Sequence, residues 1–140
     1  MNGRFFLDTN VFVYCFDSIS PAKARRAKQL VLQGITSRKG VVSYQVVQEF
    51  FNLALRKFEQ PMAVAEAERY LNTVFRPLMS VQSSQALISQ ALRLADKHRL
   101  SWYDSLIVAA ALESQCSVLY TEALQSGQRF SELQIKNPFL

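Results

Sequence analysis

Short apolar runs alternate with longer segments in which apolar residues recur at helical spacing. The runs bounded by polar or turn residues predict β-strands at residues 4–8, 40–43, 78–81, 117–121 and 133–136. The segments with three-to-four-residue periodicity predict helices at residues 21–35, 44–58, 61–76, 83–98 and 101–115. Strands that alternate with helices along the whole chain predict an α/β fold, with a central, mainly parallel sheet flanked by helices.

Local signals place the ends of several helices. Ser20 followed by Pro21 predicts an N-cap and a first helical residue. Ser101 predicts another N-cap, with Asp104 at the third helical position. Pro77 predicts that the helix before it ends, because proline lacks the N–H that a helix interior needs.

The bulk composition fits one domain over residues 1–140. Hydrophobic residues make up 49% and charged residues 19% of the chain, which is typical of a globular protein. The length allows a substantial core but not two ordinary domains. The formal net charge of +5 favours a polyanionic partner such as nucleic acid, or an acidic protein.

The densest run of positive charge lies near the start of the predicted helix 21–35, at Lys23, Arg25, Arg26 and Lys28. It fits a track for an RNA backbone and equally a solvated helix face. Trp102 and Tyr103 are suited to stacking on unpaired bases, although aromatic residues at a helix start more often belong to a core or an interface.

Several classes of function are disfavoured by residues that are rare or isolated. Cys15, Cys116 and the single histidine, His98, form no zinc-binding pattern, and two cysteines make no disulfide framework. Asp8 interrupts the N-terminal apolar run, so we expect no signal peptide. The longest uninterrupted apolar stretch, 106–112, is too short to cross a bilayer. We therefore expect a cytoplasmic protein with no membrane partner.

Four acidic residues stand at or inside apolar surroundings. Asp8 and Glu122 end predicted strands, while Glu49 and Asp104 interrupt apolar helical segments. Clustered carboxylates are costly to bury unless a cation neutralises them. Oxygen ligands without cysteine or histidine suit a hard divalent cation, and such cations commonly serve phosphate chemistry.

Each acid also has a structural explanation. Asp8 or Asn10 can cap a short helix after the first strand, and Asp104 can act within its own N-terminal turn. Glu49 can belong to a solvated helix stripe, and Glu122 can be a loop acid. The combination of the four acids carries the prediction of a site.

Four motifs in this order resemble those of the PIN-domain ribonucleases. They are Leu-Asp-Thr-Asn at 7–10, Val-Val-Gln-Glu-Phe-Phe-Asn at 46–52, Tyr-Asp-Ser-Leu-Ile-Val-Ala-Ala-Ala at 103–111, and Thr-Glu-Ala-Leu-Gln-Ser-Gly-Gln at 121–128. The ending Lys-Asn-Pro-Phe also fits. The chain looks most like the toxins of VapBC-type toxin–antitoxin pairs, over essentially its whole length.

The resemblance implies a metal-dependent endoribonuclease with an acidic pocket. The carboxylates of Asp8, Glu49 and Asp104 correspond to those that hold Mg²⁺ or Mn²⁺ in the family, with Asp8 and Asp104 as direct ligands. Asn10 and Thr121 are expected as supporting donors. The resemblance also implies a tRNA- or rRNA-class substrate, a cognate antitoxin and a homodimer.

One position departs from the family pattern. The fourth acid of the family commonly stands two residues after the threonine of the last motif, where this chain has Ala123. Glu122 is one residue early, and adjacent side chains on an extended segment point to opposite sides. We therefore treat Glu122 as a doubtful metal ligand and expect weakened activity or a single ion.

Two other functions remain open from the sequence. A PIN-like module that binds RNA or protein without cleaving it is compatible with Ala123. A haloacid-dehalogenase-type phosphatase also begins with an aspartate after a strand, but it needs a second aspartate where this chain has Asn10.

Overall fold

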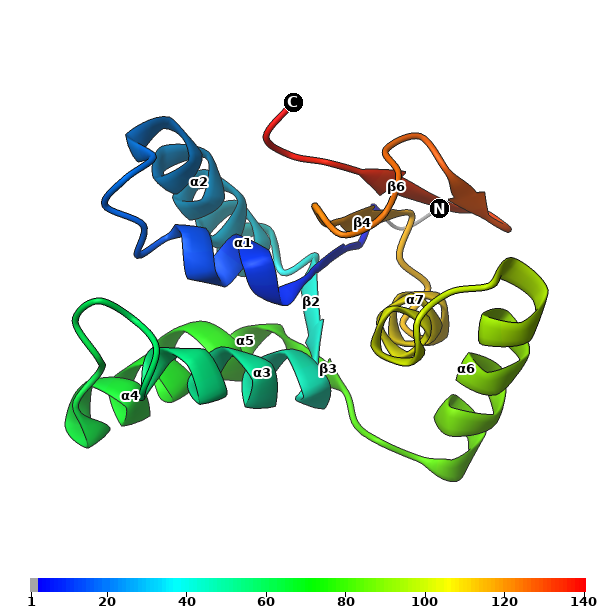
Figure 1. The fold of residues 1–140 in the computed structure, drawn as a ribbon, viewed down its shortest axis with the longest axis horizontal. Helices are drawn as coiled ribbons and strands as arrows, with labels where there is room; N and C mark the ends of the chain where they lie inside the picture. The colour runs from blue at the N-terminus through cyan, green and yellow to red at the C-terminus, as the bar shows by residue number, and fades with distance from the viewer. Residues whose placement is uncertain (1–2) are drawn as a thin grey trace.

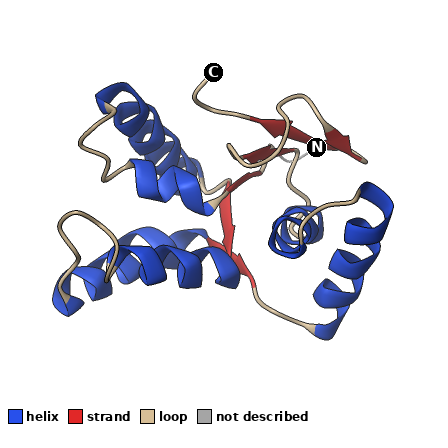
Figure 2. Cartoon of the chain, in the orientation of Figure 1, coloured by secondary structure: helices blue, strands red, loops and turns tan. Residues whose placement is uncertain are grey.

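A computed structural model describes residues 3–140 and contains one six-stranded sheet (Figures 1 and 2). The strand order is β3-β2-β1-β4-β6-β5, and only the β5–β6 pair is antiparallel. The strands are β1 (Phe5–Leu7), β2 (Gly40–Ser43), β3 (Met79–Val81), β4 (Val118–Tyr120), β5 (Arg129–Phe130) and β6 (Leu133–Lys136).

Two groups of helices flank the sheet. In Figure 1, α1 to α5 lie to the left of β2 and β3, and α6 and α7 lie to their right. The left-hand group is α1 (Thr9–Tyr14), α2 (Pro21–Ser37), α3 (Tyr44–Ala54), α4 (Val64–Tyr70), the π-helical segment η1 (Leu71–Phe75) and α5 (Arg76–Leu78). The right-hand group is α6 (Gln85–His98) and α7 (Trp102–Glu113). The α/β architecture predicted from the alternation of strands and helices is confirmed.

The order of the strands creates a crevice beyond the carboxyl ends of β1 and β4. The chain first builds outward from β1 to β2 and β3, then returns to the other side of β1 with β4. Where the strand order reverses, the connections after two neighbouring parallel strands run in opposite directions. They leave a space beyond the carboxyl ends of those strands. β1 and β4 pair from Phe5–Val118 to Leu7–Tyr120, so the residues that follow Leu7 and Tyr120 emerge side by side.

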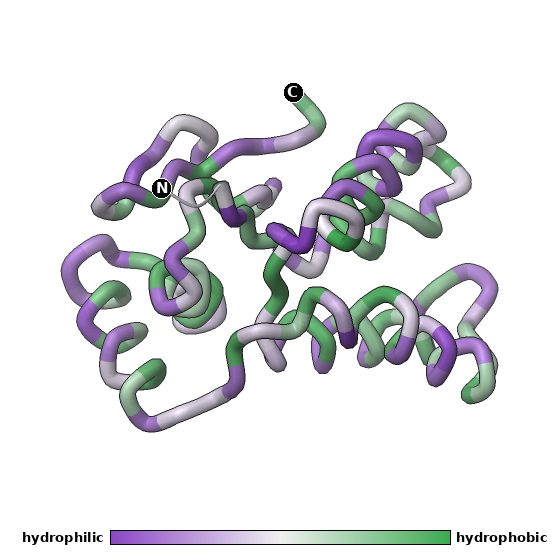
Figure 3. The backbone as a smooth tube through the Cα atoms, turned by 180° about the vertical axis from the view of Figure 1, so that it is seen from behind, coloured by the Kyte–Doolittle hydropathy of each residue, from purple (hydrophilic) through white to green (hydrophobic). Residues whose placement is uncertain are grey.

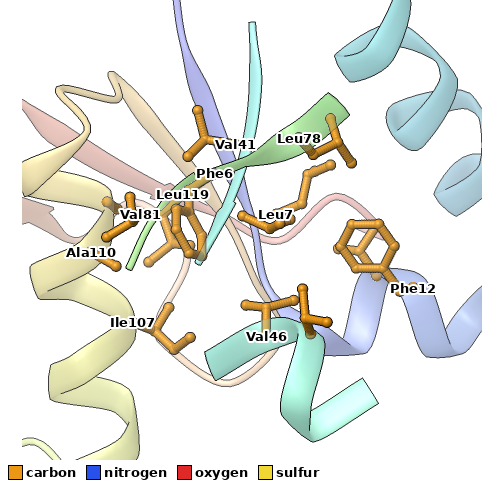
Figure 4. Packing of buried hydrophobic residues seen from close by; sticks show 14 of the residues in the cluster. Phe6, Leu7, Phe12, Val41, Val46, Leu78, Val81, Ile107, Ala110 and Leu119 are labelled. Atoms are coloured by element: carbon orange, nitrogen blue, oxygen red, sulfur yellow. The ribbon is translucent and has the colours of Figure 1, made fainter. Parts of the chain in front are cut away.

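The strands and the inner helix faces enclose one core. Figure 3 shows β2 and much of α7 as apolar, and polar positions along α2 and α6. Phe6, Leu7 and Leu119 are fully buried in the sheet, and Figure 4 shows Val46 of α3 and Ile107 of α7 packed beneath them. Apolar side chains from β1, β4, α3 and α7 therefore support the floor of the crevice. None of the helices within residues 3–140 is long and apolar enough to cross a membrane.

The prediction that a helix ends before Pro77 is wrong. The helix begins at Val64, later than expected, and continues through Pro77 to Leu78. The turn in front of the proline is π-helical, and the Arg76 amide donates to the carbonyl oxygen of Leu71, five residues earlier. This wider turn gives the proline ring room that a regular α-helix does not provide.

Other boundaries also differ from the sequence prediction. α3 ends at Ala54 rather than near Phe58, and the short strand β5 was not predicted. Pro21 is the first residue of α2 as expected, but the Ser20 side chain makes no capping hydrogen bond. The Ser101 cap is confirmed, since its hydroxyl oxygen accepts a hydrogen bond from the Asp104 amide at 3.2 Å.

A pair of glycines lets α2 lie directly against β2. A Cβ atom on Gly40 would stand 2.6 Å from the Cα of Gly34, and 2.9 Å from the Leu78 side chain. The first of these contacts is with backbone, which cannot rotate away. The close approach of helix to strand therefore depends on glycine at residue 40.

Gly40→Ala is expected to lower the free energy of unfolding by about 1–3 kcal/mol, since overpacking forces the backbone of α2 and β2 apart. Urea unfolding followed by circular dichroism measures the change. Gln33→Ala, at an exposed position of α2, should leave the free energy of unfolding within about 0.5 kcal/mol of the parent's value. Equal stability of Gly40→Ala and the parent would contradict the predicted clash.

Candidate functional site

The crevice beyond β1 and β4 holds a cavity of about 570 Å³. Its wall comes from α1, α3, α7 and the loop after β4, which are far apart in the sequence. The lining residues are Asp8, Thr9, Asn10, Val13, Tyr14, Gln45, Glu49, Asn52, Leu53, Tyr103, Asp104, Ile107, Glu122 and Ala123. All four acids singled out in the sequence therefore reach one cavity.

Asp8 is the most enclosed acid of this cavity. Asp8 is the first residue after β1 in the sequence, and it is 7% exposed. One carboxylate oxygen, Oδ1, accepts a hydrogen bond from the Thr9 amide at 2.7 Å, which caps α1. The other, Oδ2, accepts one from the Thr121 hydroxyl at 2.7 Å. Capping and participation in the acidic cluster are thus both true of this residue.

Glu49 and Asp104 reach the cavity from two different helices. Glu49 comes from the middle of α3, and its Oε1 accepts a hydrogen bond from the Thr9 hydroxyl at 3.0 Å. Asp104 lies in the first turn of α7, where the positive end of the helix dipole favours a carboxylate. Both side chains are partly exposed, as expected for groups at the mouth of a cavity rather than in the core.

The electrostatics of Asp8 tie these three acids together. Burial raises the pKa of the Asp8 carboxyl, and the negative charges of Glu49 and Asp104 raise it further. The hydrogen bonds from Thr121 and Thr9 oppose that rise in pKa but do not cancel it. A cation between the three carboxylates would relieve both the repulsion and the desolvation.

The donors present suit a hard divalent cation. The polar residues that line the cavity beside the three acids offer oxygen or amide atoms, and the Asn10 Oδ1 atom is buried without a hydrogen-bond partner. Within residues 3–140, however, no three Asp, Glu, Cys or His side chains converge closely enough to ligate one ion as they stand. The residues fit such an ion by chemistry, and rotation of the partly exposed Glu49 and Asp104 side chains is needed to enclose it.

Glu122 is held away from the other acids. Its Oε1 accepts a hydrogen bond from the Tyr14 hydroxyl at 2.7 Å, and its Oε2 forms an ion pair with the Lys23 Nζ at 3.1 Å. Its charge is not among the causes that raise the pKa of Asp8. The neighbouring Thr121 turns toward Asp8 instead, in line with the expected alternation of side chains.

Two of the four basic residues proposed for RNA contact are engaged within the chain. Lys23 pairs with Glu122 and lies over the ring of Tyr14, and the Arg26 Nε donates to the carbonyl oxygen of Pro138 at 3.2 Å. Arg25 and Lys28 are exposed on α2. The start of α2 therefore contacts Glu122 and the C-terminal segment through Lys23 and Arg26. The side chains of Arg25 and Lys28 remain exposed to solvent.

The family model for the PIN domain matches residues 5–131, a range that contains the whole acidic cluster. The chain belongs to the PIN domain family. PIN domains are generally nucleases and generally use divalent metals. The search of curated proteins found no match to this PIN domain.

Solved structures confirm the fold of this PIN domain at low sequence identity. A toxin–antitoxin complex from Klebsiella pneumoniae is 17% identical with a TM-score of 0.68, over 95% of this chain and 96% of that one. VapC20 of Mycobacterium tuberculosis, a toxin that cleaves the sarcin–ricin loop, is 23% identical with a TM-score of 0.61, over 84% and 88%. VapBC2 from Rickettsia felis, bound to promoter DNA, is 14% identical with a TM-score of 0.64, over 94% and 96%.

Sequence reasoning missed three polar residues of this PIN domain site. Gln45 directs its amide toward the Glu49 carboxylate at 3.4 Å, Tyr14 binds Glu122, and Asn52 lines the cavity from an exposed position. Gln45 and Asn52 lie four residues before and three residues after Glu49, on the same helix face. That spacing was the available signal; nothing in the sequence pairs Tyr14 with Glu122.

Asp8→Asn is expected to stabilise the metal-free PIN domain at neutral and alkaline pH. Because the pKa of Asp8 is higher in the folded than in the unfolded chain, its ionised form disfavours folding above the folded-state pKa. The effect vanishes below the unfolded-state pKa. The difference in Tm between variant and parent, measured in EDTA, should therefore be positive at alkaline pH and shrink on acidification.

Asp96→Asn, which removes an exposed carboxylate of α6, is the matched control and should change the Tm little. An Asp8→Asn protein that unfolds below the parent at alkaline pH in EDTA would mean that the two hydrogen bonds to Asp8 outweigh its burial and repulsion.

Proposed function

We propose that this PIN domain is an endoribonuclease that depends on Mg²⁺ or Mn²⁺ and acts as the toxin of a toxin–antitoxin pair. The observation that carries the proposal is the convergence of Asp8, Glu49 and Asp104 on one cavity, with the pKa of Asp8 raised first by burial and further by both of the other acids. Three carboxylates that line one cavity could hold a hard divalent ion, which suits phosphodiester hydrolysis.

The chain's own residues divide the work of holding the site. Asp8 and Asp104 are proposed as direct ligands, since they lie at a strand end and a helix start with fixed backbones. Glu49 is proposed to bind through a water or to orient the nucleophile. A bound divalent ion supplies polarisation of a phosphoryl oxygen and a lowered pKa for water.

Hydrogen bonds to the carboxylates keep the ligands in place. The Thr121 hydroxyl donates a hydrogen bond to the Asp8 carboxylate, and the Thr9 hydroxyl donates one to the Glu49 carboxylate. The Asn10 Oδ1 atom has no hydrogen-bond partner and could accept one from a hydrated ion. Such outer contacts orient metal-binding carboxylates and tune their affinity. Thr121 and Asn10 are thus proposed as supporting residues.

Ala123 and Glu122 favour one strong ion site rather than two. Ala123 brings no ligand to the cavity, and Glu122 is already satisfied by Tyr14 and Lys23. We therefore propose weaker catalysis than a PIN domain with all four acids would give.

The proposed substrate is structured RNA of the tRNA or rRNA class. The formal net charge of +5 and the exposed Arg25 and Lys28 support binding of a polyanion. Among the similar structures, one is a toxin that cleaves an RNA loop and others are complexes with antitoxins. By that likeness we propose a cognate antitoxin for this chain, and from its membership of the PIN family we propose a homodimer.

Purified protein free of antitoxin is expected to cut end-labelled total RNA into discrete fragments with Mg²⁺ or Mn²⁺ and not with EDTA. Asp8→Asn should lower the rate by more than about 100-fold, because changes even in the outer partners of metal ligands typically cost 10–100-fold. Ala123→Asp should raise the rate by adding a ligand. Ala86→Asp, which adds the same charge at an exposed position of α6, is its control.

Fragments that persist in EDTA or with Asp8→Asn would contradict the metal-dependent mechanism. Cleavage by Ala123→Asp alone would show that the parent is a binding module on a nuclease fold. Turnover of small phosphomonoesters without RNA cleavage would point instead to a phosphatase.

Removal of single carboxylates should separate the roles of the two glutamates. Glu49→Gln is expected to weaken Mn²⁺ binding by about 10-fold or more, because Glu49 belongs to the acidic cluster. Glu122→Gln should change the affinity less than about threefold, since its carboxylate already has two partners in the chain. Isothermal titration with Mn²⁺ measures both. A larger loss with Glu122→Gln would place the ion against Glu122.

A further inference from the structure

Tyr103 is an exposed aromatic residue at the mouth of the acidic cavity. It is 63% exposed and lines the cavity next to Asp104. Within residues 3–140, its ring contacts no other aromatic ring and its hydroxyl has no hydrogen-bond partner. Of the two places expected for aromatic residues at this helix start, a core or an interface, the exposure of Tyr103 excludes the core, and the interface stays a prediction. Its side chain contributes little to the folded core.

The backbone that carries Tyr103 is nevertheless firmly held. Ser101 accepts hydrogen bonds from the Asp104 amide and, through its carbonyl oxygen, from the Ser105 hydroxyl at 2.7 Å. The carbonyl oxygen of Tyr103 accepts from the Gln45 side chain at 3.5 Å, which links α7 to α3. An exposed ring on a fixed first turn is suited to contact a ligand, because the backbone loses no further freedom on binding.

The cavity beside the ring combines acids with an apolar floor. Val13, Leu53 and Ile107 line it together with Tyr103, and its volume of about 570 Å³ lies within the range of small-molecule sites. A nucleotide has this same division, with a flat apolar base attached through a sugar to a charged phosphate. An apolar peptide side chain would suit the floor, but it would bring no phosphate to a cation held by the adjacent carboxylates.

We propose that Tyr103 stacks on an unpaired nucleobase next to the scissile phosphate, an inference that rests on the proposed ribonuclease function. Adjacent Cα atoms lie about 3.8 Å apart, so the ring and the Asp104 carboxylate leave the same turn as neighbours. In RNA the base and its phosphate are likewise separated by one sugar. A phosphate that a divalent ion would hold near Asp104 therefore brings its own base, or the next one, to Tyr103.

The consequence is a preference for single strands and loops. A base within a duplex already stacks on both faces and cannot offer one to a protein ring, whereas splayed bases in loops can. Stacking tolerates all four bases, since each has a π-face. Tyr103 thus selects for unpaired structure at the cut site rather than for sequence.

Binding is measured by fluorescence anisotropy with full-length protein carrying Asp8→Asn, which suppresses cleavage. The probes are a labelled uridine oligoribonucleotide, the same backbone with abasic sites, and a blunt RNA duplex. Tyr103→Ala is compared with Tyr103→Phe, which keeps the ring, and Tyr103→Leu, which keeps only apolar bulk. Tyr44→Ala is the matched control, because Tyr44 is a tyrosine 47% exposed at the start of α3 that does not line the cavity.

Tyr103→Ala is expected to raise the Kd for the uridine oligonucleotide by about 5-fold or more, with Tyr103→Leu similar and Tyr103→Phe within about twofold of the parent. Tyr44→Ala should leave the Kd unchanged. The abasic probe and the duplex should not distinguish Tyr103→Ala from the parent.

An unchanged Kd in Tyr103→Ala, or an equal loss on the abasic probe, would overturn the stacking proposal and leave the ring to a protein partner. Cleavage of total RNA by the otherwise unmodified chain tests the proposed function separately. RNA cut by the parent without any effect of Tyr103→Ala would refute stacking alone; base-dependent binding without cleavage would refute the nuclease alone.

Discussion

The buried carboxylate of Asp8, placed beside two further carboxylates, is the unfavourable interaction around which the rest of the site is organised. Burial and repulsion both raise the pKa of Asp8, and two hydrogen bonds from Thr9 and Thr121 only partly offset them. A protein with no use for a cation would have little reason to retain this arrangement, since an apolar side chain would bury at lower cost. The hydrogen bonds from Thr9 and Thr121 to Asp8 are those expected around a carboxylate that holds a cation.

The sheet topology makes that arrangement possible. Because β1 and β4 are parallel neighbours with connections that leave in opposite directions, Asp8 and Thr121 emerge together at their carboxyl ends. α7 and α3 then bring Asp104 and Glu49 over the opening. The contacts of Glu122 show how sensitive the arrangement is to one position, because a shift of one residue along the chain turns this acid toward Tyr14 and Lys23.

The positions of Asp8 and Asp104 in the fold could be predicted because they follow from a strand end and a helix start. Asp8 ends an apolar run, and Asp104 stands three residues after a capping serine, so periodicity and capping chemistry place both. Pairings between distant side chains could not be predicted. The contact between Tyr14 and Glu122 depends on how α1 and the loop after β4 meet, and the passage of Pro77 through a helix depends on a local π turn. Neither leaves a signal in hydrophobic spacing.

The most direct test of the account is a crystal structure of the full chain with Mn²⁺, using anomalous scattering to locate the ion. We expect a peak in the cavity within ligand distance of the Asp8 and Asp104 carboxylates, with the Glu122 ion pair to Lys23 intact. A peak at Glu122 would contradict the assignment of the ligands. A cavity that takes up no Mn²⁺ in a preparation that still cleaves RNA would contradict the central claim that this acidic cluster exists to hold a catalytic cation.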